Sequence, residues 1–287
     1  MAAETNLIKS ANLVRVREID FTLMFEENIK KLMEALGVTR RIAKQAGTTL
    51  KTYKATGTLE DGAVAEGDII PLSQYTTQPV TYKEITLLKW RKATSAEAIT
   101  EKGYDQAVTM TNERMLRDVQ KGIRTRFFNF LATGTGTASG NGLQAAIAQS
   151  WGQLQVLFDD DDVQSVHFIN PLDVADYLAT ANVTTQTAFG MTYLKDFLGM
   201  GDVFLNASVP QGKIYSTAKE NLILYYIPVN DADLNEAFSF TADKTGFIGI
   251  HESPDYDNMT SKTTVINSME LMAERIDGVV VGTIAGE

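Results

Sequence analysis

The chain offers few residues that could do acid–base or nucleophilic chemistry. It has no Cys and only two His, His167 in VQSVHFIN and His251 in IHESPDYDN. A thiol nucleophile is therefore excluded, and no G-x-S-x-G segment provides a serine elbow. His251 and Glu252 lack the second His of a zinc-binding H-E-x-x-H helix. We interpret both histidines as structural, with catalysis by either as the alternative, and expect no catalytic residue.

Two acidic clusters and one Gly-rich segment could hold a ligand. Asp159 to Asp162 are four consecutive carboxylates, which repel one another, so a solvated turn is favoured over a calcium site. DYDNMT contains Asp255, Asp257 and Asn258 but lacks the Gly and distal Glu of a calcium loop. GTGTASGNG (134–142) has no Lys and follows a predicted helix, so it is interpreted as a helix terminator and linker rather than a phosphate loop. We expect no metal and no cofactor.

Composition indicates a folded protein of ordinary type. The 287 residues are 44% hydrophobic and 22% charged, which argues against wholesale disorder. No apolar stretch approaches the ~18–20 residues of a membrane span, and MAAETNLIKS is polar rather than a secretory signal. The absence of Cys fits assembly in a reducing cytoplasm.

Charge divides the chain into two unequal halves. Residues 1–126 carry 20 Lys/Arg and 16 Asp/Glu, a net of +4, whereas residues 127–287 carry 6 and 20, a net of −14. Nucleic-acid binding through a basic face is therefore improbable for the second half. The acidic surface either confers solubility alone or meets the basic half of another copy.

A long hairpin without a core of its own is the most unusual predicted element. TTLKTYKATGT (48–58) and QPVTYKEITLLKW (78–90) favour strands, but neither has a consistently apolar face. Between them lie Gly57, Gly62, Gly67 and Pro71, which bend the chain. An isolated two-stranded ribbon is marginal in water. The hairpin either folds back on its own domain or finds its apolar surface on another chain.

Helical spacing predicts two helices in the first half. Phe21, Phe25, Ile29, Leu32 and Leu36 define one face, with Asp20 as the expected N-cap, Gly37 as the stop and residues 1–18 as an irregular arm. A second helix over 104–132, ~43 Å long at 1.5 Å per residue, is amphipathic enough to act as a spine. We expect it to pack through the residues on its apolar face: Met115, Val119, Ile123 and Phe127.

The remainder of the chain alternates helices and strands. We predict helices at 143–158, 171–181 and 192–199, the second beginning at Pro171 and the third ending at Gly199. Strands are predicted at 38–46 (or a linker), 163–170, 202–208, 213–217 and 221–229. In 261–284 the Thr/Val part and GVVVGTI favour strands, with an ambiguous polar stretch between them.

The order of these parts resembles the major capsid proteins of tailed bacteriophages, which have the Hong Kong 97-type fold. The resemblance is to those of siphophages in particular. It covers most of the chain and is carried by these segments: AVAEGDIIPLS (63–73), ITLLKWRKATSAEAITEKGYDQAV (85–108), FFNFLATGTGT (127–137), FINPLDVADYL (168–178), SVPQGKIYST (208–217) and ERIDGVVVGTI (274–284).

This resemblance implies an α+β fold in five parts. These are an N-terminal arm and helix (1–47), an extended hairpin loop (48–90), a spine helix with part of a peripheral domain (91–142), an axial domain (143–240) and a return to the peripheral domain (241–287). In the family the hairpin lies across a neighbouring subunit, which would supply its missing core. The expected inter-subunit contacts are Tyr53, Gly62, Val64, Glu66, Gly67, Ile69, Ile70 and Pro71.

The resemblance also implies a structural function rather than an enzymatic one. Hexamers and pentamers would build an icosahedral virion capsid in the host bacterial cytoplasm, enclosing phage double-stranded DNA without sequence-specific binding or membrane contact. A portal and a separate scaffolding protein are expected as partners, with N-terminal trimming as the alternative to the scaffold. Lys51 and Lys54 lie near the loop but do not align with the Lys–Asn crosslinking of some relatives, so we expect no covalent crosslinks.

Two other functions remain open. An encapsulin-type bacterial compartment shares the fold, and Phe21, Phe25 and Ile29 would then line a cargo groove beside the N-terminal helix. An acidic α/β hydrolase is the alternative from another class, but the sequence offers no nucleophile for it.

Overall fold

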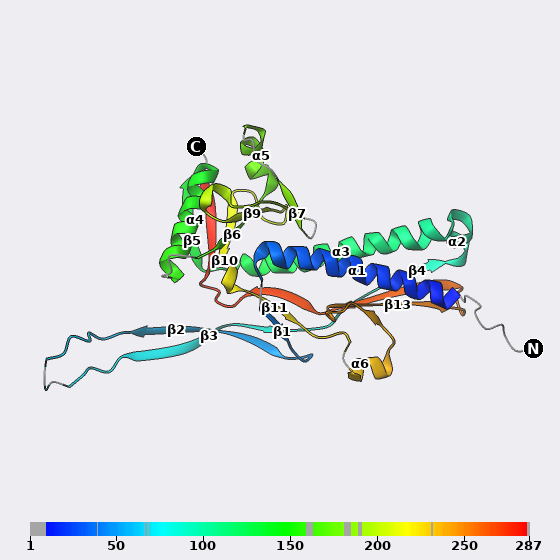
Figure 1. The fold of residues 1–287 in the computed structure, drawn as a ribbon, viewed down its shortest axis with the longest axis horizontal. Helices are drawn as coiled ribbons and strands as arrows, with labels where there is room; N and C mark the ends of the chain where they lie inside the picture. Colours follow the sequence, from blue (N-terminus) through cyan, green and yellow to red (C-terminus); the bar gives the residue numbers. More distant parts are fainter. Residues whose placement is uncertain are drawn as a thin grey trace, which may run out of the picture.

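The computed structural model describes residues 10–38, 40–65, 67, 69–158, 163–180, 185–188, 191–230 and 232–285. Its elements form an elongated body with a hairpin projecting from one end (Figure 1). The helices are α1 (Ser10–Leu36), α2 (Ala96–Lys102), α3 (Met110–Leu131), α4 (Gly142–Phe158), α5 (Pro171–Thr180) and α6 (Ala232–Ala237). Short π and 3-10 turns occupy Asp105–Thr109, Phe197–Gly199 and Lys219–Asn221.

The strands form four separate sheets. A seven-stranded sheet has the order β5 (Gly136–Asn141), β16 (Val279–Ala285), β10 (Lys213–Ala218), β6 (Ser165–Ile169), β9 (Asp202–Leu205), β8 (Met191–Leu194) and β7 (Gln186–Ala188). A four-stranded sheet contains β12 (Thr241–Ala242), β13 (Ile248–Asp255), β14 (Thr260–Asn267) and β4 (Leu88–Ser95). β1 (Arg40–Ala43), β11 (Leu222–Tyr226) and β15 (Met269–Ala273) form the third, and β2 (Thr49–Thr58) with β3 (Gln74–Glu84) the fourth.

The N-terminal helix α1 confirms its predicted apolar face but not its predicted start. Phe25, Ile29 and Leu36 are buried in the main core. The helix runs through Asp20 from Ser10, so the expected N-cap at Asp20 and the irregular arm over 10–18 are wrong. It ends as predicted at Gly37, where φ is +68° and the Val38 N–H donates to the Met33 carbonyl at 2.9 Å.

The spine helix α3 extends along the body beside α1 (Figure 1). Together with the preceding π turn it covers nearly the whole predicted span 104–132. Its last turns bring Phe127 and Phe128 against Phe168 of β6, with both pairs of ring centroids 5.4 Å apart and near-perpendicular. Phe168 in turn lies 5.6 Å from Phe204 of β9. This aromatic cluster joins the spine to the seven-stranded sheet.

Polar contacts fix the other end of α3 to the four-stranded sheet. The buried Asn112 donates to Glu252 of β13. Lys92 of β4 donates to the Val108 carbonyl at 3.1 Å, and burial lowers its pKa. Since this carbonyl belongs to the π turn, the irregular first turn of the spine has a charged partner from the sheet.

Several local predictions are wrong because tertiary pairing overrode them. The Gly-rich 134–142 segment contains β5, which pairs in parallel with β16, and is not only a terminator and linker. Residues 192–199 form the edge strand β8 and a 3-10 turn instead of a helix. The ambiguous part of 261–284 contains β15. The predicted strand 78–90 is two strands, β3 and β4, separated by residues 85–87.

The end of the chain does not follow the expected return to a peripheral domain. The span 241–287 includes β13 and β14 beside the spine, but β16 lies inside the seven-stranded sheet between β5 and β10. The helices at 143–158 and 171–181 and the strands at 163–170, 202–208, 213–217 and 221–229 are confirmed within a few residues. β1 likewise occupies part of 38–46.

Candidate assembly interface

The hairpin β2–β3 is a regular antiparallel ladder. It pairs Thr49 with Glu84 at its base and Thr58 with Gln74 at its far end. The register shifts by one between Thr52 and Tyr53, where β3 carries an extra residue next to Pro79, which has no N–H to donate. The ladder's hydrogen bonds are therefore satisfied between the two strands, but each strand keeps one edge without a partner strand in the described residues.

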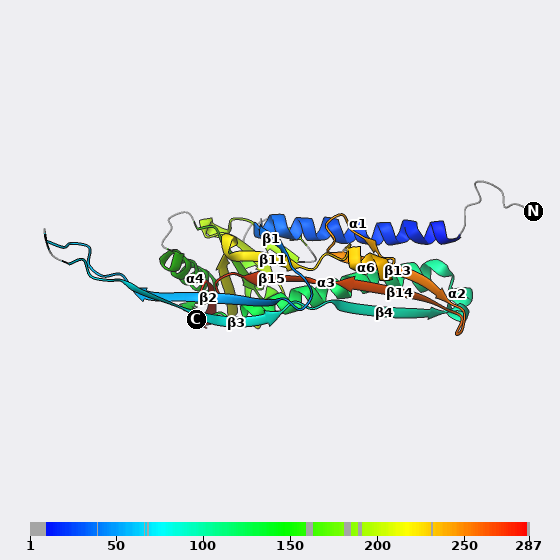
Figure 2. The same ribbon diagram turned by 90° about the horizontal axis from the view of Figure 1, so that it is seen from below.

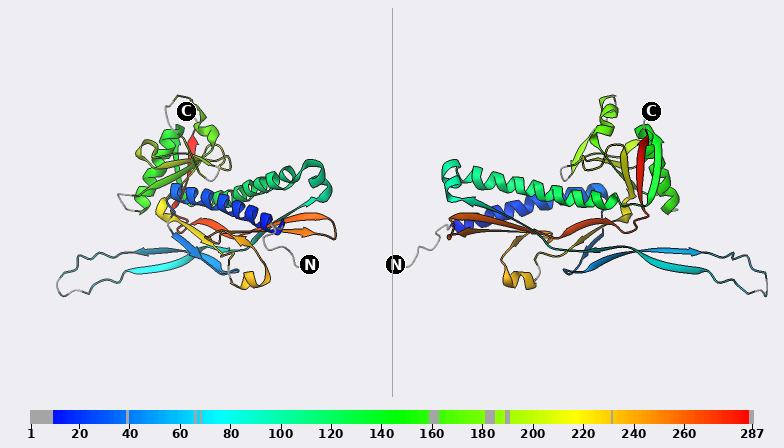
Figure 3. Two further views of the ribbon diagram at one scale, coloured as in Figure 1. Left: turned by 45° about the vertical axis from the view of Figure 1, so that its right-hand side comes forward. Right: turned by 180° about the vertical axis from the view of Figure 1, so that it is seen from behind.

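Only the root of the hairpin is anchored in the body. Leu50 and Ile85 are buried in the main core, and the Ile85 N–H donates to the Thr48 carbonyl at 3.1 Å. Beyond this point neither strand packs extensively on another described element. Figure 2 shows the ribbon extending away from the helices and sheets, and Figure 3 shows the same projection from two further sides. The hairpin therefore does not fold back on its own domain.

The tip of the hairpin, residues 59–73, exposes a set of large apolar side chains. Ile69 and Leu72 are each 93% exposed. Leu59 and Ile70 are exposed as well, and so is Tyr75 just behind them in β3. Burying one aliphatic side chain of this size contributes roughly 1.5–3 kcal/mol. A contiguous group of them in water indicates a contact surface.

Local hydrogen bonds order this tip. The Glu60 N–H donates to Ser73 Oγ at 3.1 Å across the loop, and the Ala63 N–H donates to Asp61 Oδ1 at 2.9 Å. Gly67 has φ +94°, a conformation that L side chains rarely adopt. The carboxylates of Glu60 and Asp61 are exposed among the apolar side chains, so the tip is both acidic and apolar.

The predicted contact residues fall mostly on this tip. Gly62, Val64, Gly67, Ile69, Ile70 and Pro71 all belong to it. Tyr53 lies in β2, but its side chain and all of Glu66 are outside the described residues. The prediction missed Leu59, Leu72 and Tyr75. Leu72 could have been found, because it directly continues the apolar run Ile69–Ile70–Pro71.

The spine residues predicted to pack are in the body. Val119, Ile123 and Phe127 are buried in the main core, and the partly buried Met115 packs against it. They stabilise the subunit from within, whereas the tip residues have no such support.

The chemistry-bearing residues are not gathered into a catalytic arrangement in the described part of the chain. His167 is completely buried, with Nε2 donating to the Met200 carbonyl at 2.9 Å and Nδ1 2.7 Å from Ser216 Oγ. Burial lowers the pKa of His167 to about 4. His251 contacts the Phe240 ring, with centroids 6.3 Å apart.

The predicted acidic clusters hold no metal arrangement among the described residues. Asp255 and Asp257 lie at the β13–β14 turn, where Lys262 pairs with Asp255 and holds its pKa below the usual value. Asp159 to Asp162 are outside the described residues. No described helix is long and apolar enough to cross a membrane.

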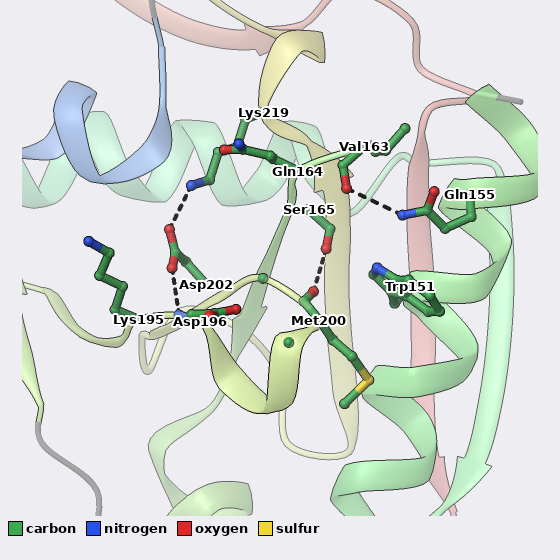
Figure 4. Close-up of a pocket in the computed structure, with 12 residues that line it drawn as sticks. Trp151, Gln155, Val163, Gln164, Ser165, Lys195, Asp196, Met200, Asp202 and Lys219 are labelled. Carbon is green, nitrogen blue, oxygen red and sulfur yellow. Dashed lines mark hydrogen bonds and ion pairs between the residues drawn. The ribbon is translucent and has the colours of Figure 1, made fainter. Parts of the chain in front are cut away.

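A polar hollow of about 420 Å³ lies between the C-terminal part of α4 and the turn after β8 (Figure 4). Lys219 and Asp202 form an ion pair at 2.7 Å on its wall, and Asp202 also accepts the Asp196 N–H at 2.8 Å. Gly201 is required there, because a Cβ would lie 2.1 Å from the Ser165 carbonyl oxygen. These charged groups satisfy one another, so the hollow is a structural junction rather than an unfilled site.

A second, smaller groove of about 200 Å³ lies between α1 and the start of α3. Phe21, Met24 and Leu116 give it an apolar floor, and Asp20 and Glu113 place carboxylates at its margin.

Comparison with known proteins finds likeness only at the level of structure. No family model and no curated protein matches the chain by sequence. The fold matches the capsid of a native GTA particle, with TM-score 0.57 and 10% identity over 99% of this chain and 95% of the other. It also matches the cyanophage A-1(L) capsid (TM-score 0.54, 12% identity, 88% and 91%) and the SrpI encapsulin of Synechococcus elongatus (TM-score 0.53, 10% identity, 98% and 91%).

These neighbours are shell proteins, and the matches span almost the entire chain. The observed projecting hairpin, spine helix and two-part body agree with that architecture. The chain therefore has the α+β Hong Kong 97-type fold of phage capsid and encapsulin shell proteins.

Proposed function

We propose that this protein is a major capsid protein whose copies assemble as hexamers and pentamers into the icosahedral head of a tailed phage. The observation that carries the proposal is the hairpin tip, where Ile69, Ile70 and Leu72 are exposed and have no apolar bed in their own subunit. A neighbouring subunit would supply that bed. Each subunit then gives one hairpin and receives another, which produces heterologous contacts that close into rings.

The head would be built from many weak contacts and would rearrange in concert when double-stranded DNA enters. A scaffolding protein and a portal complete the proposed set of partners. The net charge of −14 over residues 127–287 would limit adhesion of DNA if that surface faces the lumen. The DNA is enclosed without sequence-specific binding, in a virion assembled in the host cytoplasm.

Deletion of residues 58–68 tests the role of the hairpin. Leu50 and Ile85 at the root are retained, so the subunit should stay folded and soluble, with the circular dichroism of the full chain. Electron microscopy should show shells for the full chain and none for the deletion variant. Normal particles from the deletion variant would disprove the trans-binding role.

An encapsulin-type compartment is the second candidate, supported by the groove between α1 and α3. Of the three side chains expected to line such a groove, Phe21 does so, whereas Phe25 and Ile29 are buried in the core. The contents of purified particles separate the two functions. Nuclease-protected double-stranded DNA of uniform length supports a phage head, and a single co-purifying enzyme inside DNA-free shells supports a compartment.

A further inference from the structure

Charge is segregated along the hairpin and the segments at its root. Residues 40–58 carry five Lys/Arg and no Asp/Glu, and residues 74–92 carry four Lys/Arg and one Glu, a combined net of +8. The tip, residues 59–73, carries four Asp/Glu and no Lys/Arg, a net of −4. The acidic tip and the basic root segments are complementary, but a rigid ribbon keeps them apart within one subunit.

The basic root continues into an open face of the four-stranded sheet. Alternate residues of β4 face α3: Lys92 donates to the Val108 carbonyl, and Trp90 packs against the main core. Lys89 and Arg91 therefore project from the opposite face, where both are exposed. Figure 1 shows α1 and α3 on one side of this sheet and α6 on the other. Phe238, just after α6, is exposed and adds apolar surface to that second side.

The hairpin is long enough to reach across such a face. From Thr49 to Thr58 there are nine steps of ~3.4 Å, or ~31 Å before the tip begins, and the eight residues of β4 cover a similar ~27 Å. The root cations also keep few internal partners. Arg40 is paired with Glu274 and Lys92 with carbonyl and hydroxyl groups, but no ion pair is found for Lys89 or Arg91 in the described part of the chain.

We propose that the tip of one subunit docks on the open face of β4 of a second copy, with Glu60 and Asp61 meeting Lys89 and Arg91. The contact combines apolar burial by the tip with charge pairing that sets its register. It rests on the proposed shell function and names the surface that receives the hairpin. The groove between α1 and α3 is the competing bed, but Asp20 and Glu113 at its margin would repel the acidic tip.

Because the chain has no Cys, disulfide trapping tests this contact directly. Ala63 at the tip and Ala93 on the open face of β4 are both exposed. A63C and A93C chains, co-assembled and oxidised in particles, should form a mixed disulfide dimer on a non-reducing gel. A63C with M24C, which probes the α1–α3 groove, is the matched control and should stay unlinked. Linkage to M24C without linkage to A93C would overturn the proposal.

Charge reversal provides a second readout that does not depend on Cys. E60K with D61K should lower the yield of particles at least about tenfold, equivalent to ~1.4 kcal/mol per contact. K89E with R91E in the same chain should restore it, and raised salt should weaken wild-type assembly. No rescue and no A63C–A93C linkage, in wild-type preparations that still form shells, overturns this docking site and leaves the shell function intact. Shells from the 58–68 deletion would instead overturn the shell role of the hairpin itself.

Discussion

The hairpin tip and the junction between spine and sheet use similar apolar side chains with opposite results. At the junction, Phe127, Phe128 and Phe168 are each at most 3% exposed and meet edge to face. At the tip, Ile69 and Leu72 are 93% exposed. The junction residues stabilise the subunit, whereas the tip residues contribute nothing to it. Their burial free energy is reserved for a step after folding, which in our proposal is assembly.

The two regions also differ in how they satisfy polar groups. In the body, the carboxylates of Asp202 and Glu252 are partnered inside the same chain, by Lys219 and Asn112. At the tip, Glu60 and Asp61 expose their charge at the end of a ribbon with cations only at its root. A subunit that is finished in one region and incomplete in the other is expected of a part that functions in many copies.

The largest effect on the free energy of unfolding is expected at the aromatic junction. Phe168→Ala removes the ring that contacts Phe127, Phe128 and Phe204, and should lower the free energy of unfolding by about 3–5 kcal/mol. Denaturant unfolding of the unassembled subunit measures this, with Phe168→Leu as the milder control. A loss under ~1 kcal/mol would show that the junction is not part of the subunit's core.

Acid should have the next largest effect, through His167. Burial holds its folded pKa at about 4, below the unfolded value of 6.5, so the unfolded chain binds the proton first. The contribution of His167 is unchanged above about pH 6.5 and falls as pH drops toward 4, by roughly 3 kcal/mol in total at 1.36 kcal/mol per pKa unit. His167→Gln, compared with wild type at each pH, should flatten the decline in this window. An equal decline in both proteins would rule out His167 as its source.

The smallest effect on stability is expected at the tip. Ile69→Ser with Leu72→Ser should change the free energy of unfolding by less than ~0.5 kcal/mol, because both side chains are already in water. The same variant should fail to form shells by electron microscopy. If it assembles normally, the contrast between a finished body and an unfinished tip has no functional meaning. If it unfolds more easily, the tip packs on its own subunit after all.

Much of the local structure was predictable because it depends on periodicity. The apolar face of α1, the spine at 104–132 and the start of α5 at Pro171 follow from side-chain spacing and chain-breaking residues, which act over a few positions. The tip could be recognised from the run Ile69–Ile70–Pro71 between glycines. The start of α1 could not, since a helix can pass through Asp20 when other contacts stabilise it.

The sequence by itself determined that the chain has no thiol chemistry, a long amphipathic spine and an acid-tipped ribbon without a core. Tertiary structure alone decided that Gly136–Asn141 is a strand, because its parallel partner β16 lies over 130 residues away and supplies the hydrogen bonds that its own side chains do not predict. It also decided that 192–199 is an edge strand rather than a helix, since β9 offers a ladder there. Periodicity is local, whereas strand pairing is a property of the whole fold.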